Sequence, residues 1–368
     1  MTGGRCLDMR ENPPYYGKNR CRCQAGYLCG PMMERRSTVD KTVFYIQTGS
    51  VEPDYNLALE EYILTHRTAG SYLLLWQNDN AIILGQNQNM AAEIDPLFVR
   101  AHQIRVVRRS TGGGAVYHDL GNLNYSFITD WDVCGEDVGQ SFVLPVVRAL
   151  RELGLAAEGS GRNDILVEEK KVSGTAQRIC GSRILHHGTL LFDSDLDVLS
   201  CALKTDPEKF QTKNIRSVRS RVANIRQMLK SDMDLDSFRD HMLRSLTRGQ
   251  YVPQSLSARE LEAVEQIRAD KYGNPAWNRG REGHYTLCNR RRWSGGSVEF
   301  CAAVDGGLMT EVAFFGDFLS ARPLDELVQA LRGCPFLPGA VEAVFRRQPI
   351  NEYFGAVSMA QVMETIFG

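Results

Sequence analysis

The chain has 368 residues, of which 43% are hydrophobic and 24% charged, and its formal net charge is −1 at pH 7. This composition is typical of a soluble globular protein with one large or two medium domains. A charge near zero argues against a nucleic-acid binder that neutralises phosphates, and no apolar run approaches the roughly 20 residues that cross a bilayer. We therefore expect a cytoplasmic protein with no nucleic-acid or membrane partner.

The first 40 residues differ in composition from the rest. They are rich in glycine and lack helical or strand periodicity, so residues 1–40 are predicted to be a disordered or non-native extension, with translation starting at Met32 or Met33 as one interpretation. Four of the ten cysteines lie there at a spacing that matches no zinc site. The other six are scattered without paired spacing, which favours reduced thiols in a cytosol-like compartment: Cys134, Cys180, Cys201, Cys288, Cys301 and Cys334.

Regular structure is predicted from residue 43 onward. Apolar residues alternate or cluster in short segments and recur at helical spacing in longer ones. The predicted strands are 43–46, 72–76, 81–84, 104–107 and 123–128, and the predicted helices are 53–66, 91–102 and 140–153.

The stretch RRSTGGGAVYHDLGNLN, which starts at Arg108, is the most informative part of the chain. Its three glycines, Gly112, Gly113 and Gly114, are disfavoured unless a group approaches the backbone closely or φ turns positive. Arg108 and Arg109 supply planar donors suited to phosphate or carboxylate oxygens. The stretch is neither a Walker loop nor a GxGxxG turn before a helix. It predicts a backbone cradle for an anionic ligand, with a tight hairpin turn as the alternative.

The second half of the chain mixes strands and helices. Strands are predicted at 165–167, around 172 and at 184–192, and helical patterns follow over 196–248. After a break near 251–253, two strands at 297–304 and 308–315 flank an Asp-Gly-Gly turn, which is a strong hairpin signal, and a helix is predicted at 324–331. This order favours a mixed α/β (α+β) fold with a separate α+β domain from about residue 255.

Lys171 lies in a second dense region, KKVSGTAQR. If Val172 points into the core, Lys171 and Ser173 share the opposite face of the strand. An ammonium there could bridge a carboxylate and an α-phosphate, and an exposed strand lysine is the alternative. Asn163 and Asp164 can supply a carbonyl and a carboxylate to a nucleotide or Mg²⁺, or form an Asx turn before a strand.

Two further features have both a structural and a functional interpretation. His186 and His187 invite a metal site, but adjacent residues of a strand face opposite ways, which favours structural or supporting roles. The run 204–221 carries six basic residues against two acidic ones, as a solvated face does, or as a mobile loop that closes over phosphates.

Together, the segments RRSTGGGAVYHDLGN, GRNDILV with KKVSGTAQR, HHGTLL and SVRSRVANI occur in an order that resembles the lipoate–protein ligase A family. The resemblance extends from about Val43 to the C-terminus, where FFGDF and the following helix look like the family's accessory domain. It implies a large catalytic domain at 41–250, whose mixed sheet is flanked by helices, and a smaller α+β accessory domain at 255–368.

The resemblance also implies a two-step reaction. Lipoate and ATP, with Mg²⁺, give lipoyl-AMP and pyrophosphate, and the ε-amine of an acceptor lysine then displaces AMP. Lys171 would be the catalytic residue, acting electrostatically on the lipoyl carbonyl and the phosphate, and Asp164 is a candidate for Mg²⁺. The implied ATP- and adenylate-binding residues are Arg109, Gly114, Ala115, Val116, Tyr117, Asn163, Asp164 and Lys171. The implied lipoate-binding residues are Arg108, Gly112, Gly113 and Lys171.

The implied acceptors are lipoyl domains of 2-oxoacid dehydrogenase E2 subunits and the glycine-cleavage carrier protein. One alternative is an ATP-independent octanoyl or lipoyl transferase, for which Cys180 would be the nucleophile. Biotin ligase is disfavoured, because its arginine-glycine activation loop has no counterpart here. A non-catalytic lipoyl-adenylate binder is a third alternative, and Arg109 and Lys171 argue against it. The sequence leaves the choice between lipoate and octanoate open.

Overall fold

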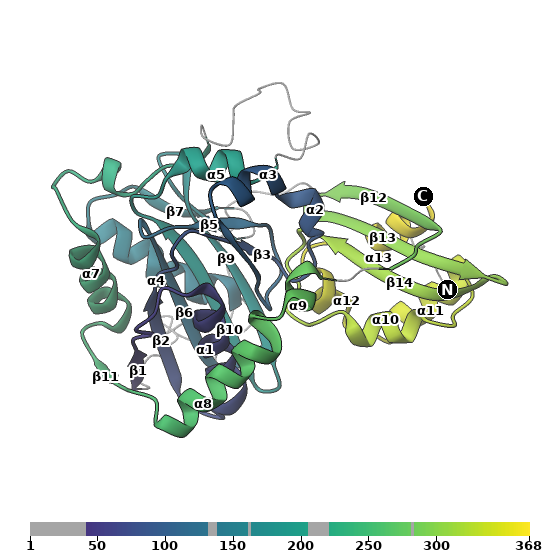
Figure 1. The fold of residues 1–368 in the computed structure, drawn as a ribbon, viewed down its shortest axis with the longest axis horizontal. Helices are drawn as coiled ribbons and strands as arrows, with labels where there is room; N and C mark the ends of the chain where they lie inside the picture. Colours follow the sequence, from purple (N-terminus) through teal and green to yellow (C-terminus); the bar gives the residue numbers. More distant parts are fainter. Residues whose placement is uncertain (1–41, 132–137, 161–162, 205–220, 281–282) are drawn as a thin grey trace, which may run out of the picture. The chain divides into compact units, whose positions relative to one another are not determined.

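One large mixed sheet carries most of the sequence motifs. The computed structural model describes residues 42–131, 138–160, 163–204, 221–280 and 283–368, so the predictions for residues 1–40 and for most of the run 204–221 lie outside it. Within this part, eight strands pair in the order β11-β1-β2-β6-β10-β9-β8-β7 (Figure 1). They are β1 (Val43–Ile46), β2 (Ser71–Trp76), β6 (Asn122–Asp130), β7 (Ala157–Ser160), β8 (Asp164–Val167), β9 (Lys170–Cys180), β10 (Arg183–Leu191) and β11 (Tyr251–Pro253).

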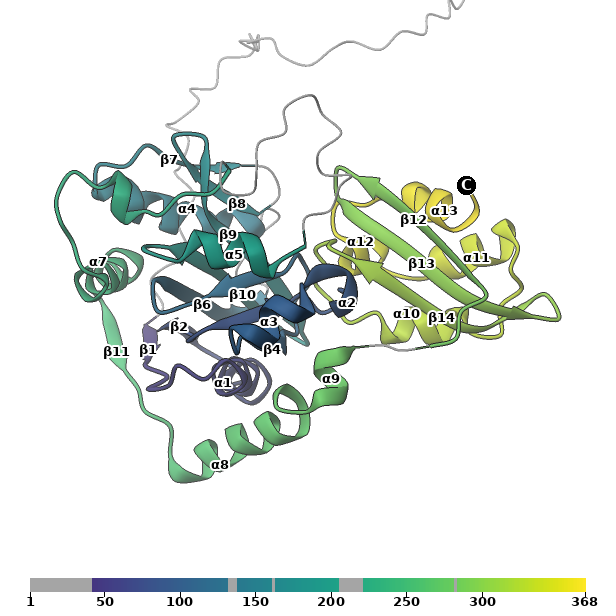
Figure 2. The ribbon, with the colours of Figure 1, turned by 45° about the horizontal axis from the view of Figure 1, so that its top comes forward.

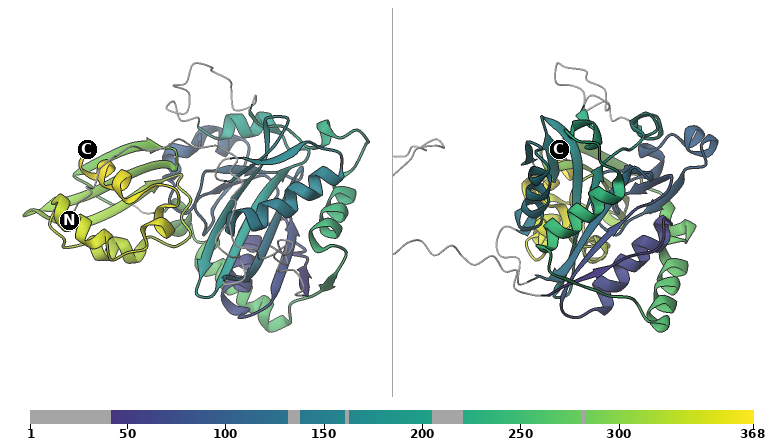
Figure 3. Two further views of the ribbon diagram at one scale, coloured as in Figure 1. Left: turned by 180° about the vertical axis from the view of Figure 1, so that it is seen from behind. Right: turned by 90° about the vertical axis from the view of Figure 1, so that its left-hand side faces the viewer.

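The sheet is mixed, as predicted. Strand β1 runs parallel to β2 and β11, whereas β2, β6, β10, β9, β8 and β7 pair antiparallel. Helices α4 (Val138–Glu152) and α7 (Leu235–Thr247) cover one face and α1 (Pro53–His66) the other, and α8 (Ala258–Ile267) packs on α1 (Figure 3). The alternation of each strand therefore divides its side chains between two cores.

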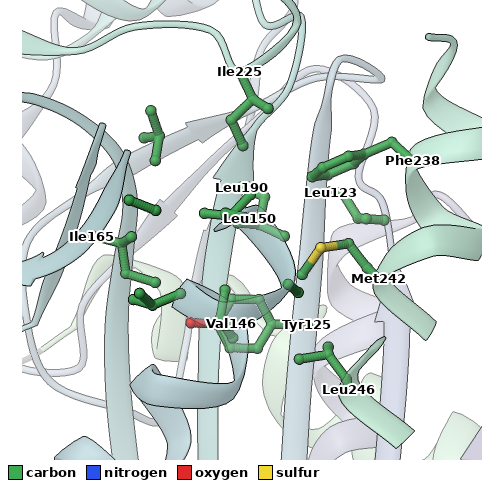
Figure 4. Packing of buried hydrophobic residues seen from close by; sticks show 14 of the residues in the cluster. Leu123, Tyr125, Val146, Leu150, Ile165, Leu190, Ile225, Phe238, Met242 and Leu246 are labelled. Atoms are coloured by element: carbon green, nitrogen blue, oxygen red, sulfur yellow. The ribbon is translucent and has the colours of Figure 1, made fainter. Parts of the chain in front are cut away.

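The first of these cores lies between the sheet and α4 and α7. Tyr125 and Leu190 of the strands meet Val146 of α4 and Phe238 of α7, and all four are almost fully buried (Figure 4). The opposite face of the same strands, with Leu74 and its neighbours, packs on α1. Polar residues on that second face are positioned by a rigid sheet rather than by a loop.

A smaller sheet in the order β4-β3-β5 carries the glycine motif. Its strands are β3 (Ala81–Leu84), β4 (Arg105–Arg108) and β5 (Val116–His118), and α2 (Met90–Glu93), α3 (Pro96–Ala101) and α5 (Leu196–Ala202) lie near it (Figure 2). The single helix predicted at 91–102 is wrong, because it is interrupted before Pro96. Asp95 caps the new helix by accepting hydrogen bonds from the amides of Leu97 and Phe98, both at 2.9 Å.

The C-terminal part has its own hydrophobic core. The sheet β12-β13-β14 packs against helices α10 to α13 through residues such as Phe300 and Phe345. The predicted hairpin is confirmed, with positive φ at both Gly306 and Gly307. The elements are β12 (Leu287–Trp293), β13 (Gly296–Asp305), β14 (Leu308–Gly316), α10 (Asp325–Leu331), α11 (Pro338–Phe345), α12 (Ile350–Phe354) and α13 (Met359–Phe367). Between the two parts of the chain lie a π-helix (Arg268–Tyr272) and α9 (Pro275–Arg279), and a 3-10 turn (Arg226–Met228) precedes α7.

Two cysteines that were expected to be reduced form a disulfide. Cys288 and Cys301 stand directly opposite each other on β12 and β13, with their Cα atoms 4.2 Å apart, and their sulfurs are bonded. The sequence hides this pair, because only the hairpin brings residues thirteen positions apart into register. Cys180, Cys201 and Cys334 are free thiols.

Where the chain is described, its helices are too short or too polar to cross a lipid bilayer.

His186 is an uncharged base inside an apolar environment. Its ring stacks on Phe142 at 4.8 Å, and neither ring nitrogen has a hydrogen-bond partner among the described residues. Burial, with a smaller effect of His187, lowers the pKa of His186 to about 3.

This burial predicts a pH-dependent stability. The folded chain keeps His186 neutral, whereas the unfolded chain protonates it below a pH of about 6.5. The free energy of unfolding should therefore fall as pH falls below that value, by about 2 kcal/mol for this residue at pH 5. In urea unfolding, His186→Phe keeps the stacking and should remove this part of the pH dependence. A stability difference between variant and wild type that is constant from pH 7 to pH 5 would contradict it.

Candidate active site

The three glycines of the motif have different surroundings. A methyl group on Gly112 would lie 2.4 Å from the amide nitrogen of Ser320, and Gly113 has a φ of +92° and donates its N–H to the Phe318 carbonyl at 3.1 Å. A methyl group on Gly114 would meet no atom within 4 Å. Gly112 and Gly113 thus leave no room for a side chain beside the segment that follows β14, whereas Gly114 faces open space.

Arg109 holds this loop in shape. Its Nε donates to Thr111 Oγ1 at 2.9 Å, and its Nη2 donates to the carbonyls of Gly112 at 2.6 Å and Gly114 at 2.9 Å. A further bond joins Nη1 to the Ile83 carbonyl at 3.1 Å. Burial lowers the pKa of Arg109 to about 10, so it stays charged at neutral pH.

Arg108, which the resemblance assigns to lipoate binding, is engaged with the main chain in the described structure. Its side chain is buried and binds main-chain carbonyls only, three of them in residues 85–88 and three in residues 277–279. The guanidinium therefore ties β4 to two segments far away in the sequence. Gly112 and Gly113, which were also predicted to line the lipoate pocket, pack against residues 318–320.

Lys171 pairs with Asp164 across the β8–β9 hairpin. The distance from Lys171 Nζ to Asp164 Oδ1 is 2.8 Å, and both side chains are about one-third exposed. Asn163 is used by the fold, since its Nδ2 donates to the Thr175 carbonyl at 2.9 Å and its own carbonyl accepts from the Thr175 amide. The main chain of Ala223 donates to the Lys171 carbonyl at 3.0 Å, so residues just after the basic run return to this lysine.

The expectation that Lys171 and Ser173 share a face is wrong. Ile165 pairs with Ser173 but Leu166 pairs with Lys171, which leaves Val172 as an extra residue. This bulge reverses the alternation, so Val172 and Ser173 are both buried while Lys171 reaches outward.

A cavity of about 100 Å³ joins the glycine loop to Lys171. Of the predicted residues, Arg109, Gly114, Ala115, Val116, Asn163 and Lys171 line it, and Asp164 reaches it through Lys171. Its other walls are Leu57, Trp76, Ile83, His118, Asn124, Gly174, Thr175, Ala176, His187, Gly188 and Thr189.

Alternation along β5 explains which residues of the motif face this cavity. Val116 and His118 line it, whereas Tyr117 points into the core around α5 and donates to Asn80 Oδ1 at 3.2 Å. The side chain of Tyr117 therefore does not reach the cavity where adenylate binding was expected. The same alternation could have identified His118 from the sequence.

A buried polar chain lies under the loop and was not predicted. Glu60 of α1 accepts from His187 Nδ1, 3.0 Å away, and from the hydroxyl of Ser126. His187 Nε2 lies 2.9 Å from Thr111 Oγ1, which itself accepts from Arg109. His187 thus faces the cavity and His186 the apolar core, as the alternation predicted.

The neighbouring Glu61 forms a second cluster of charged and polar side chains. Its carboxylate pairs with Lys271 Nζ at 2.8 Å and Arg178 Nη1 at 3.3 Å, and it accepts a hydrogen bond from Tyr272. Burial raises the pKa of Glu61, but Arg178 and Lys271 outweigh this effect and lower it. Glu61 is therefore a partly buried anion with partners of opposite charge.

Cys180 lies far from this cavity. Cys180 packs on the α1 side of the sheet, at the far end of β9, about 30 Å along the strand from Lys171. Among the residues that the structure describes, no three His, Cys, Asp or Glu side chains gather as a metal site would require.

Known proteins share both parts of the chain. Residues 52–247 match the family described as "Lipoyl protein ligase A/B catalytic domain", and residues 283–366 match "Bacterial lipoate protein ligase C-terminus". A Bacillus subtilis protein named lipoate-protein ligase LplJ is 39% identical over 321 residues, which cover 86% of this chain and 97% of that protein.

Solved structures agree. A lipoate-protein ligase A bound with ATP has a TM-score of 0.57 and 28% identity, covering 65% of this chain and 98% of its own. A bipartite lipoate protein ligase from Thermoplasma acidophilum, studied with its E2 lipoyl domain, has a TM-score of 0.58 and 29% identity over 67% of this chain and 99% of its own. This chain belongs to the lipoate–protein ligase family.

Proposed function

We propose that the chain activates lipoate with ATP in the cavity beside Lys171 and transfers the lipoyl group to a lysine of an acceptor protein. The observation that carries this is the position of Lys171: an ammonium about one-third exposed, paired with one carboxylate, beside a cavity that continues into the protein. The backbone of Gly114, Ala115 and Val116 forms the adjacent wall, where a nucleotide can approach the main chain closely.

The chemistry follows from the charges that must meet. A lipoate oxygen attacks the α-phosphorus of ATP, pyrophosphate leaves, and a mixed anhydride forms. The Lys171 ammonium lowers the repulsion between carboxylate and phosphate and stabilises the charge that develops on the phosphoryl oxygens. In the second step the neutral amine of the acceptor lysine attacks the lipoyl carbonyl, AMP leaves, and the new amide loses a proton to solvent.

Mg²⁺ fits this site as a companion of the nucleotide. It usually binds one or two carboxylates plus substrate phosphates, and Asp164 is the carboxylate beside Lys171. Asp164 would hold the ion, and the ion would supply charge neutralisation for the leaving pyrophosphate. The Arg109 guanidinium, engaged with the loop, would orient Gly114 toward the phosphate.

The acceptors we propose are lipoyl domains of 2-oxoacid dehydrogenase E2 subunits and the glycine-cleavage carrier protein, in a cytoplasmic setting. A related archaeal ligase studied with an E2 lipoyl domain supports the first class. We also propose a catalytic domain at 41–250 and an accessory domain at 255–368. The core of the sheet β12-β13-β14 is separate from that of the large sheet, which supports two domains, whereas Val264 and Tyr272 pack on α1.

A mass measurement tests the whole activity. Purified chain incubated with lipoate, ATP, Mg²⁺ and an apo lipoyl domain should add one lipoyl group to the acceptor, and omission of ATP should prevent it. An equal gain of mass without ATP would favour the transferase alternative, and no gain with ATP would refute the ligase activity.

Lys171→Met should nearly abolish adenylate formation, since it keeps the length of the side chain and removes its charge. We expect lipoate-dependent pyrophosphate release to fall about 100-fold or more. Lys170→Met is the matched control, because Lys170 is the exposed neighbour on the same strand. Wild-type release from the Lys171 variant would exclude the assigned role.

Substitutions at Gly112 and Gly114 should have opposite signatures. Gly112→Ala pushes a methyl group against Ser320 and should lower the free energy of unfolding by about 1–3 kcal/mol. Gly114→Ala meets no atom of the protein, so stability should change by less than about 0.5 kcal/mol. We expect it instead to raise the KM for ATP, measured by pyrophosphate release. A Gly114 variant with unchanged KM would remove this residue from the nucleotide wall.

A further inference from the structure

The cavity has an open and a closed end. The Lys171 side chain is 37% exposed at one end, whereas Trp76, His118 and Ile83 at the other are 4%, 3% and 1% exposed. The acceptor amine must reach the lipoyl carbonyl from outside, so the carboxyl group lies at the Lys171 end. The far end of the acyl chain then lies among Trp76, Ile83 and His118. This step rests on the function proposed above.

The protonation of His118 is fixed by a chain of amides. Asn56 Nδ2 lies 2.8 Å from the Gln77 carbonyl and 3.1 Å from the Ser50 carbonyl, so this atom is a donor. It also lies 3.0 Å from Asn78, whose facing atom is therefore the acceptor Oδ1. The Nδ2 of Asn78 is left to donate to His118 Nδ1 at 3.0 Å. His118 Nδ1 is thus the unprotonated nitrogen, and Nε2 carries the hydrogen.

That N–H has no partner among the residues that the structure describes. His118 Nε2 is buried and makes no hydrogen bond to any described residue, and its ring lines the closed end of the cavity. Burial, together with the nearby Arg109 and His187, lowers the pKa of His118 to about 3, so the ring is neutral. An unpaired donor in such a place is costly unless a ligand satisfies it.

The two candidate acyl groups differ at this end. Lipoate and octanoate share an eight-carbon backbone and a carboxylate, but lipoate has two sulfurs in a ring at its far end, where octanoate has only CH₂ and CH₃ groups. Leu57, Ile83 and Ala176 cannot separate the two, because an apolar wall accepts both. Sulfur is a weak hydrogen-bond acceptor and packs well on aromatic rings, and Trp76 is held in place by its own bond to Ser126 at 2.8 Å.

We propose that His118 is a specificity-determining residue that donates its Nε2–H to a sulfur of the lipoyl ring, next to the Trp76 indole. Octanoate leaves this donor unpaired, so the site favours lipoate. No covalent step is involved, and the role is separate from that of Lys171 at the other end of the cavity.

The test compares two acids in one assay. Pyrophosphate release is measured with lipoate and with octanoate for the wild type, His118→Phe and His118→Gln. His118→Phe should lower kcat/KM for lipoate relative to octanoate by about threefold to tenfold, the range of one neutral hydrogen bond, with the KM for ATP unchanged. His118→Gln can place an amide N–H near the position of Nε2 and should keep most of the preference. Ile83→Val is the matched control, because it trims the same end without changing a polar group, and it should affect both acids by the same factor.

The outcomes separate the two levels of the proposal. If the wild type releases pyrophosphate with neither acid, the ligase function fails. If it uses both equally well, or if His118→Phe lowers both by the same factor or raises the KM for ATP, the function stands and the sulfur contact is refuted. Should His118→Phe fail to fold, His118→Gln decides. This variant keeps a hydrogen-bond donor, so loss of its preference for lipoate over octanoate also overturns the contact.

Discussion

A buried negative charge on α1 organises the site. The carboxylate of Glu60 lies inside the protein, where it is stable only with partners, and it finds them in Ser126 and His187. Through His187 it orders Thr111, and through Thr111 it orders Arg109. A helix on one side of the sheet thereby determines the backbone of a loop on the other side of the cavity. Removing one member would leave a buried charge or donor without a partner, so the chain acts as a unit.

The glycine loop has one packed side and one open side. Gly112 and Gly113 contact residues 318–320 after β14, and Gly114 opens to the cavity beside Lys171. The same loop therefore serves the packing of the C-terminal part and the shape of the ligand site. Arg108, at the end of β4, also contributes to this packing, since it donates to the carbonyls of residues 277–279, which precede the C-terminal part. The loop needs glycines because it must both pack closely against residues 318–320 and leave space at the cavity.

Patterns of neighbouring residues in the sequence predicted those elements that depend on neighbouring residues alone. The Asp-Gly-Gly hairpin, the mixed sheet and the opposite orientations of His186 and His187 follow from turn residues and strand alternation, and the structure confirms them. The bulge at Val172 could not be predicted, because it depends on the partner strand. The contacts of Arg108 could not be predicted, because the six carbonyls that it binds belong to segments about 20 and 170 residues away. The functional roles of Lys171, Asp164 and Gly114 remain predictions, now supported by their shared position at one cavity.

The ion pair of Lys171 and Asp164 has an electrical consequence. Without ligands, the one ammonium at the open end of the cavity is already neutralised by a carboxylate of the same hairpin. A carboxylate substrate and a triphosphate bring several negative charges to this end of the cavity, where the Lys171–Asp164 pair carries no net charge. Charge neutralisation must then come from outside this pair, for example from a metal ion that arrives with the nucleotide. The affinity of the empty site for its substrates is therefore governed by cation supply and ionic strength as much as by the shape of the cavity.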